Sequence, residues 1–173
     1  MSLLLVSLQK IDRWARGLLP VVLALILLLI GMVPVRLAGL TPISPWLLLV
    51  LVYFWTAHRP DLLPAAAVFL LGVLGDLMAG GPVGPGAFTL LVVHATVRAQ
   101  RRHILPHSFL VQWVVFALLA VMAEAILFLA CMVAYRSILP VEPAAFQALM
   151  TIAIYPCIAW VFVQVQHAFL RQA

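Results

Sequence analysis

Charged side chains are scarce in this sequence. Only 9% of its 173 residues are charged, whereas 66% are hydrophobic and the mean hydropathy is +1.22. Soluble domains are about a quarter charged and about half apolar. This composition excludes a soluble globular protein and predicts an integral membrane protein. The length allows about six spans with short connections, which leaves no room for a separate soluble catalytic domain.

Motifs that indicate chemistry are also missing. The sequence contains no HExxH, no GxSxG, no Walker loop and no set of nucleophile, base and orienting residue. Cys131 and Cys157 lie in apolar runs without CxxC spacing, which favours small core residues over a metal site or a disulfide. The net charge of +5 comes from basic residues scattered between apolar runs, which is typical of topology signals. We therefore expect no enzyme activity, cofactor, metal or nucleic-acid partner.

The apolar runs predict an all-α, polytopic protein with a single transmembrane domain over residues 1–173. Residues 1–16 predict an interfacial amphipathic helix. The run that follows is too long for a signal-peptide core, so it is interpreted as the first span. The second run is short for a crossing, and it is expected to be extended by residues 40–43 or to lie in a thin or protein-lined region. The spans are expected at residues 18–39, 44–57, 62–79, 85–100, 106–137 and 143–170.

The basic residues sort to one side of this arrangement. With the N-terminus inside, eight Lys and Arg residues fall on the inner side, and only Arg36 and Arg136 fall on the outer side. This bias predicts cytoplasmic termini, a cytoplasmic Arg59 segment and an outer position for residues 81–85. The run RAQRRHILPH between the fourth and fifth spans is the most basic surface, suited to anionic lipid or to a specific partner. Its arginines are Arg98, Arg101 and Arg102.

Aromatic residues and one proline add detail to this prediction. An aromatic belt predicts Trp14, Trp55 and Trp113 near the inner interface, and Trp46 and Tyr135 near the outer one. In the last span, the Tyr155-Pro156 pair predicts a kink.

Asp76 is an acid within the third span. Val68, Gly72, Asp76 and Gly80 recur every four residues and predict one small, acidic helical stripe that faces protein. An intramembrane Asp opposes insertion by about 2.5 to 3.5 kcal/mol, so it needs partners or a proton. The GGPVGPG turn that follows has free backbone amides, and a carboxylate that accepts hydrogen bonds from them is the favoured role. Pairing with Arg36, or a proton-relay or substrate role, are the alternatives.

Glu124 is a second acid at a similar depth, in the fifth span. It is interpreted either as a functional intramembrane charge or as a hydrogen-bonding group at a close helix contact among alanines. Arg36 ends the first span on the outer side and is the natural cation for Asp76 or Glu124. His94, in the fourth span, is expected to be a packed, neutral histidine.

The segment FLLGVLGDLMAGGPVGPGAFTLLVVHATVRAQRR resembles the signature region of the bacterial rod shape-determining protein MreD family. The family has a Gly-x-x-x-Asp pair followed by glycine, a Gly-Pro-x-Gly turn and an apolar helix. Val83 and Pro85 depart mildly from the family pattern and make the turn stiffer. The motif, together with Gly80, is the candidate structural and partner site, and its matching residues are Gly72, Asp76, Gly81, Pro82 and Gly84.

The resemblance implies a non-enzymatic scaffold of the cell-elongation machinery in the bacterial inner membrane. It implies binding to the bitopic protein MreC and, through it, an influence on MreB filaments, on the wall glycosyltransferase and transpeptidase pair and thus on peptidoglycan synthesis. The family also looks like the substrate-binding subunits of energy-coupling-factor transporters in fold. A vitamin-type transport subunit is therefore the alternative function, although Asp76, Glu124 and Gln147 are the only polar groups found for a ligand cavity.

Overall fold

The computed structural model describes residues 20–31, 44–106, 108–137 and 139–170. The all-α prediction is confirmed for these residues, which contain no strand. The predicted interfacial helix over residues 1–16, the ends of the first span and Arg36 lie outside them. The elements are the helix Pro20–Gly31, α2 (Leu47–His58), the short 3-10 helix η1 (Pro60–Leu62), α3 (Ala65–Ala79), α4 (Pro85–Ile104), α5 (Phe109–Tyr135) and α6 (Val141–Leu170).

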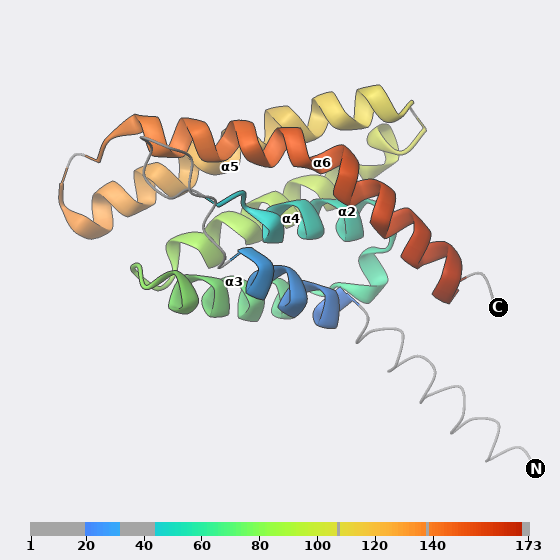
Figure 1. Ribbon diagram of the computed structural model, residues 1–173, viewed down its shortest axis with the longest axis horizontal. Coiled ribbons are helices and arrows are strands. Elements are labelled where there is room, and N and C mark those ends of the chain that lie inside the picture. Colours follow the sequence, from blue (N-terminus) through green and yellow to red (C-terminus); the bar gives the residue numbers. More distant parts are fainter. Residues whose placement is uncertain (1–19, 32–43, 107, 138, 171–173) are drawn as a thin grey trace, which may run out of the picture.

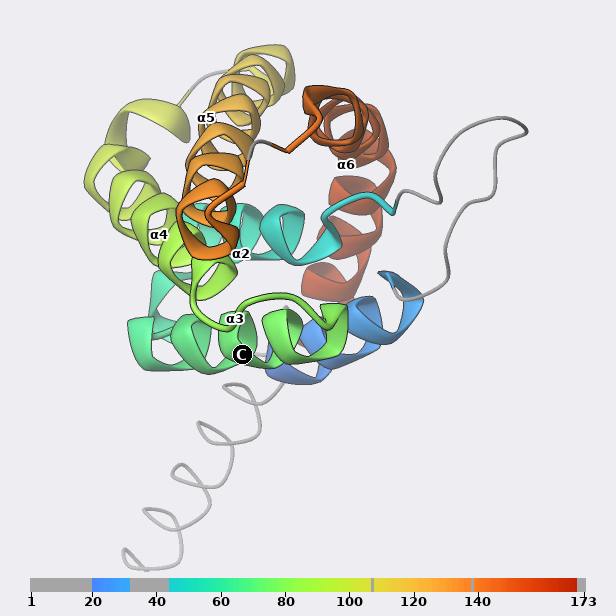
Figure 2. The same cartoon turned by 90° about the vertical axis from the view of Figure 1, so that its left-hand side faces the viewer.

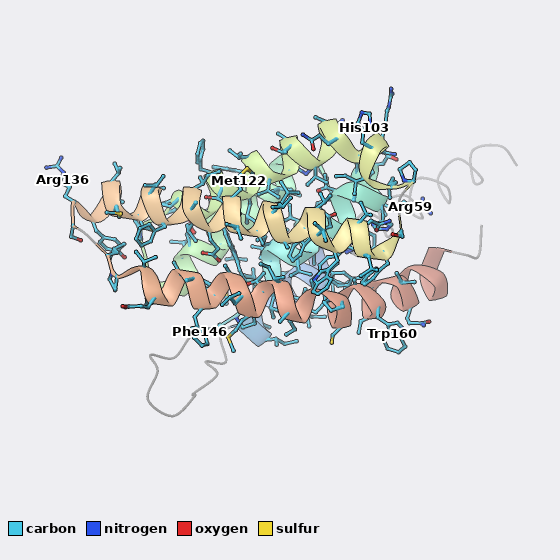
Figure 3. All side chains as sticks on the ribbon, turned by 90° about the horizontal axis from the view of Figure 1, so that it is seen from above. Arg59, His103, Met122, Arg136, Phe146 and Trp160 are labelled. Atoms are coloured by element: carbon cyan, nitrogen blue, oxygen red, sulfur yellow. The ribbon has the colours of Figure 1, made fainter. Side chains whose placement is uncertain are left out.

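Successive helices run in opposite directions along the long axis of the molecule (Figure 1). This arrangement gives the described bundle two distinct ends. We call one the turn end, which holds residues 80–84 between α3 and α4 and the C-terminus of α5. The other is the basic end, which holds Arg59 and the last turn of α4. Figure 3 shows Arg136 at the turn end and Arg59 and His103 at the basic end, so the bundle separates these arginines as the sequence predicts.

The helices differ in how clearly they qualify as membrane spans. Two are long and apolar enough to cross a membrane, Phe109–Tyr135 and Val141–Gln164. The apolar helices Pro20–Gly31, Leu47–His58 and Ala65–Ala79 are shorter than a full crossing. α4 is 20 residues long but carries arginines in its last two turns. A crossing number of six therefore stays a prediction.

α2 lies at the centre of the described bundle. Figure 2, which looks along the helices from the turn end, shows it surrounded by α3, α4, α5, α6 and Pro20–Gly31. All residues from 47 to 57 are buried, as expected for a helix that is apolar on every side. Twelve residues extend about 18 Å, less than a hydrocarbon core of about 30 Å. Its burial agrees with the protein-lined position considered for this short run, whereas the extension by residues 40–43 lies outside the described residues.

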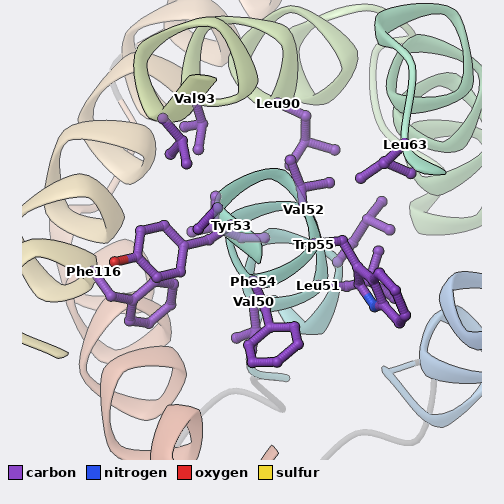
Figure 4. Close-up of a cluster of buried hydrophobic side chains, with 14 of the residues drawn as sticks. Val50, Leu51, Val52, Tyr53, Phe54, Trp55, Leu63, Leu90, Val93 and Phe116 are labelled. Atoms are coloured by element: carbon purple, nitrogen blue, oxygen red, sulfur yellow. The ribbon is translucent and has the colours of Figure 1, made fainter. Parts of the chain in front are cut away.

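Aromatic rings fill the space around the second half of α2. The ring of Tyr53 packs against those of Phe116 of α5 and Tyr155 of α6, with centroids 5.1 and 5.7 Å away, and the latter two rings stack on each other at 4.2 Å. Figure 4 shows Tyr53 beside Phe116. The phenol of Tyr53 also donates to the carbonyl of Gln112 over 2.9 Å. Trp55 has no exposed surface, so its predicted place in an interfacial aromatic belt is wrong. Its indole packs inside the bundle because α2 is enclosed by other helices.

α6 continues through Pro156 from Val141 to Leu170. Figure 1 shows that its direction changes in its second half, as the proline predicts. Proline has no amide hydrogen, so it cannot donate to the carbonyl four residues earlier, that of Ile152. The indole of Trp113 on α5 donates to this carbonyl over 3.1 Å. Trp113 therefore joins α5 to α6. The sequence predicted it only as part of an interfacial aromatic belt and did not predict this hydrogen bond.

The boundaries of α4 require another correction. The run that begins RAQRR was expected to connect two spans beyond residue 100, but α4 extends to Ile104. The three arginines therefore lie on its last two turns, where positive charge is favourable beside the carbonyl end of a helix. They carry their charge to the basic end of the bundle as part of a helix.

Candidate functional site

The site starts from a close contact between α3 and α4. These two helices form the most extensive helix pair in the described bundle. Gly72 on α3 lies against the backbone of Ala87 on α4, and a Cβ atom at Gly72 would lie only 2.5 Å from the Cα of Ala87. Glycine is therefore required here for the two backbones to approach. The contact confirms the close packing predicted for Gly72.

The turn between the two helices uses two glycines with positive φ. α3 ends at Ala79 and is capped by Gly80, whose φ of 70° is the left-handed conformation common at helix C-termini. Gly84 has a φ of 124° and immediately precedes α4, which begins with Pro85. A Cβ at Gly80 would meet nothing within 4 Å. The prediction that Gly80 belongs to a close-packing stripe is therefore wrong. The role of Gly80 is to end the helix.

Asp76 reaches from the last turn of α3 to the beginning of α4. Its Oδ2 accepts backbone hydrogen bonds from Gly84, Gly86 and Ala87 over 2.7, 3.2 and 3.3 Å. These amides are donors that the first turn of α4 cannot satisfy within the helix. A negative carboxylate there also complements the positive end of the helix dipole. The favoured prediction for Asp76, an acceptor for the amides of the turn, is confirmed.

Gly86 completes this capping arrangement, and the sequence reasoning missed it. A Cβ at Gly86 would overlap the Asp76 carboxylate, so any side chain there displaces the acceptor. The signal was present in the sequence as the last glycine of GGPVGPG. Its meaning depends on Asp76 lying directly over the first turn of α4, which only the packing of α3 on α4 establishes.

A cavity of about 730 Å³ adjoins the capped turn. It lies at the turn end of the bundle, between the beginnings of α2 and α6, the end of α3 and the second half of α5. Most of its wall is apolar, and its polar side chains include Asp76, Glu124 and Gln147. The three polar groups that the sequence suggested for a ligand cavity are thus brought to one place. The predicted motif residues Gly72, Gly81 and Pro82 also line it.

Glu124 is deeply placed in this wall. Its side chain is 6% exposed, and its Oε1 has no hydrogen-bond partner among the described residues. Ala120 and Ala123, on the same part of α5, are fully buried. The predicted pairing of Glu124 or Asp76 with Arg36 involves a residue outside the described ranges and stays a prediction.

Hydrogen bonds between α2 and α6 hold another side of the cavity in place. The Trp46 amide, just before α2, donates to Oγ1 of Thr151 over 2.8 Å. That hydroxyl donates in turn to the carbonyl of Gln147 over 2.7 Å, and Nε2 of Gln147 donates to the carbonyl of Ser44 over 3.0 Å. The beginning of α2 is thus held by α6, just as the beginning of α4 is held by Asp76 of α3. No sequence signal identified Ser44 or Thr151.

The remaining predicted residues lie elsewhere. Arg98 and Arg102 are exposed and Arg101 is partly exposed near the basic end, so the basic surface and the cavity are separate. His94 is 3% exposed, and its Nδ1 lies 2.9 Å from Oγ1 of Thr56, which confirms the prediction of a packed histidine. Cys131 is a free cysteine on the cavity wall.

These features define the class of protein: an all-helical membrane protein in which Asp76 and Glu124 lie at the capped α3–α4 turn and its cavity. The family model described as rod shape-determining protein MreD matches residues 12–169, and the chain belongs to this family. Its function is therefore in rod shape determination. No curated protein and no solved structure matches the chain.

Proposed function

We propose that this protein is a non-enzymatic, multi-pass scaffold of the cell-elongation machinery in the bacterial inner membrane, and that it binds MreC. One observation carries the proposal. The Asp76 carboxylate, the charged group of the family motif, accepts three hydrogen bonds from backbone amides at the start of α4. A carboxylate used in this way holds two helices together, whereas a general base needs an oxygen that reaches the proton of a substrate. The motif therefore supports a structural role in an assembly.

In this proposal the turn end faces the outside and the basic end faces the cytoplasm, because cytoplasmic segments are enriched in Lys and Arg. The extracytoplasmic part of MreC meets the turn end. Influence on MreB filaments and on the wall glycosyltransferase and transpeptidase pair is indirect, through MreC. The exposed arginines of α4 contact anionic lipid at the inner surface.

Cysteine labelling tests this orientation. In a chain whose Cys131 and Cys157 are replaced, we expect Val83→Cys to react with an impermeant reagent added to intact cells, because Val83 is 53% exposed in the turn. Arg101→Cys should react only after the membrane is opened. The reverse pattern would place the turn end in the cytoplasm and reject the orientation.

Substitutions of Asp76 test the scaffold itself. Asp76→Asn keeps an acceptor oxygen of similar size, so we expect it to retain most co-purification with MreC and most rod-shape complementation. Asp76→Leu leaves amides of the turn unpaired, at about 1 to 3 kcal/mol. That variant should lose both the partner and the rod shape. Co-purification and cell shape are measured at matched expression levels.

Asp61→Asn is the matched control, because Asp61 is an exposed residue of η1 and does not line the cavity. It should behave like the unchanged protein in both measurements. An Asp76→Asn variant that assembles fully with MreC yet fails to restore rod shape would show that the charge itself is needed. The structural role of Asp76 would then be wrong.

A vitamin-type transport subunit is the second proposal, because the cavity gathers Asp76, Glu124 and Gln147 in an apolar wall. Its volume lies within the range of about 300 to 1,000 Å³ for small-molecule pockets. A mild-detergent pull-down separates the two functions. Recovery of MreC supports the scaffold, and recovery of a pair of ATPases supports the transporter.

A further inference from the structure

We propose that the turn-end cavity binds a small organic cation, an amine or amidinium group on an apolar body, with Glu124 as the charged acceptor. This site does not depend on MreC binding, because every group that forms it belongs to this chain. Glu124 lines the cavity and is only 6% exposed. Its Oε1 has no hydrogen-bond partner among the described residues. A carboxylate in such a place requires a donor that the described chain does not supply.

The charge of the wall selects a cation. Asp76 and Glu124 both border the cavity, and no Lys, Arg or His is among the described residues that line it. Within the described part of the wall, two carboxylates without a cation create a negative potential in a region of low dielectric constant. An anion or a phosphate is therefore repelled, and a positive group is attracted.

The other residues of the wall favour a cation that carries an apolar organic group. Trp46 and Phe128 both line the cavity, and aromatic rings attract cations and pack against flat apolar groups. A bare metal ion is a poor fit, because no group of three or more His, Cys, Asp or Glu that could hold one occurs in the described part of the chain. The volume of about 730 Å³ suits a molecule of drug-like size.

A pair of probes with nearly the same shape tests the proposal on the unchanged, full-length protein in nanodiscs of zwitterionic lipid. Benzamidine is a cation, and benzamide is its neutral counterpart. We expect saturable binding of benzamidine by equilibrium dialysis, at least about tenfold tighter than benzamide, the factor that a charge-assisted hydrogen bond supplies. Empty nanodiscs measure partition into lipid. Equal affinity for the two probes, or no saturable binding of benzamidine, would overturn the proposal.

Variants locate the site. Glu124→Gln keeps the shape of the side chain and removes its charge, so benzamidine binding should weaken at least about tenfold while benzamide binding stays the same. Glu142→Gln is the matched control, since Glu142 is exposed at the start of α6 and does not line the cavity. Ala144→Phe keeps both carboxylates and fills the space, so it should abolish binding. Tight benzamidine binding by both Glu124→Gln and Ala144→Phe would place the site elsewhere and reject the proposal.

Discussion

The two halves of the bundle are built differently. Around the second half of α2 the interior is solid, with Tyr53, Phe116 and Tyr155 in ring contact and without exposed surface beyond 1%. Toward the turn end the helices line a partly open cavity bordered by two carboxylates. The packed half supplies cohesion through many close contacts, whereas the hollow half keeps space and polar groups that add little to packing. We infer that the packed half supplies most of the stability and that the hollow half recognises a partner or ligand.

The largest expected effect separates two phenylalanines of α5. Phe116 is fully buried in the packed half, and Phe128 lines the cavity. Phe116→Ala should lower the free energy of unfolding by about 3 to 5 kcal/mol, the usual range for a large buried ring. Phe128→Ala should lower the free energy of unfolding by less than about half of that amount, because Phe128 lines the cavity and has fewer packing partners to lose.

Unfolding by SDS in mixed micelles measures both changes. The two substitutions replace the same residue type in the same helix, so their effects on membrane insertion and on helix propensity are matched. An equal loss of stability from the two substitutions would show that the cavity wall is packed as firmly as the core. The comparison between the halves would then fail.

The next effect compares two glycines of α3. A Cβ at Gly72 meets the backbone of Ala87 at 2.5 Å, but one at Gly75 meets only leucine side-chain ends at 3.5 Å. Gly72→Ala should therefore separate α3 from α4 and destabilise the protein by about 1 to 3 kcal/mol. Gly75→Ala should be neutral or stabilising by up to about 1 kcal/mol, because alanine favours helix.

Thermal unfolding in detergent checks both glycine variants, and co-purification with MreC reports whether the capped turn survives. If Gly72→Ala is as stable as Gly75→Ala, the close approach of the two backbones is not required. The position of Asp76 over α4 would then need another explanation.

The smallest effect concerns the hydrogen bond from Trp113 to the carbonyl of Ile152, in the packed half. Trp113→Phe removes the donor and should cost about 1 kcal/mol beyond the change in packing. In a Pro156→Ala background the helix supplies its own amide to that carbonyl, so the same substitution should cost less. A double-mutant cycle on unfolding free energies gives the difference. A coupling energy of zero would mean that Trp113 acts by packing alone.

Several features of the site could be predicted because their causes are local. Asp76 lies near the end of α3 and eight to eleven residues before its three donors, so a tight turn alone brings the carboxylate to the amides. The glycines at 80 and 84 mark positions of positive φ that a turn of this length requires. The prediction that Gly80 packs on the helical stripe is nevertheless wrong, because α3 ends at Ala79 and Gly80 is its left-handed C-cap.

Apolar content and the spacing of residues along the chain are enough to predict the class of this protein, its all-α secondary structure and the capped turn. The central place of α2, the burial of Trp55 and the cavity shared by Glu124, Gln147 and Asp76 follow from tertiary packing. The physical reason is that the lipid-facing side of a membrane helix is as apolar as its buried side, so the usual contrast between faces is absent. Contacts such as that between Trp46 and Thr151 join residues 105 positions apart, and the packing of whole helices decides them.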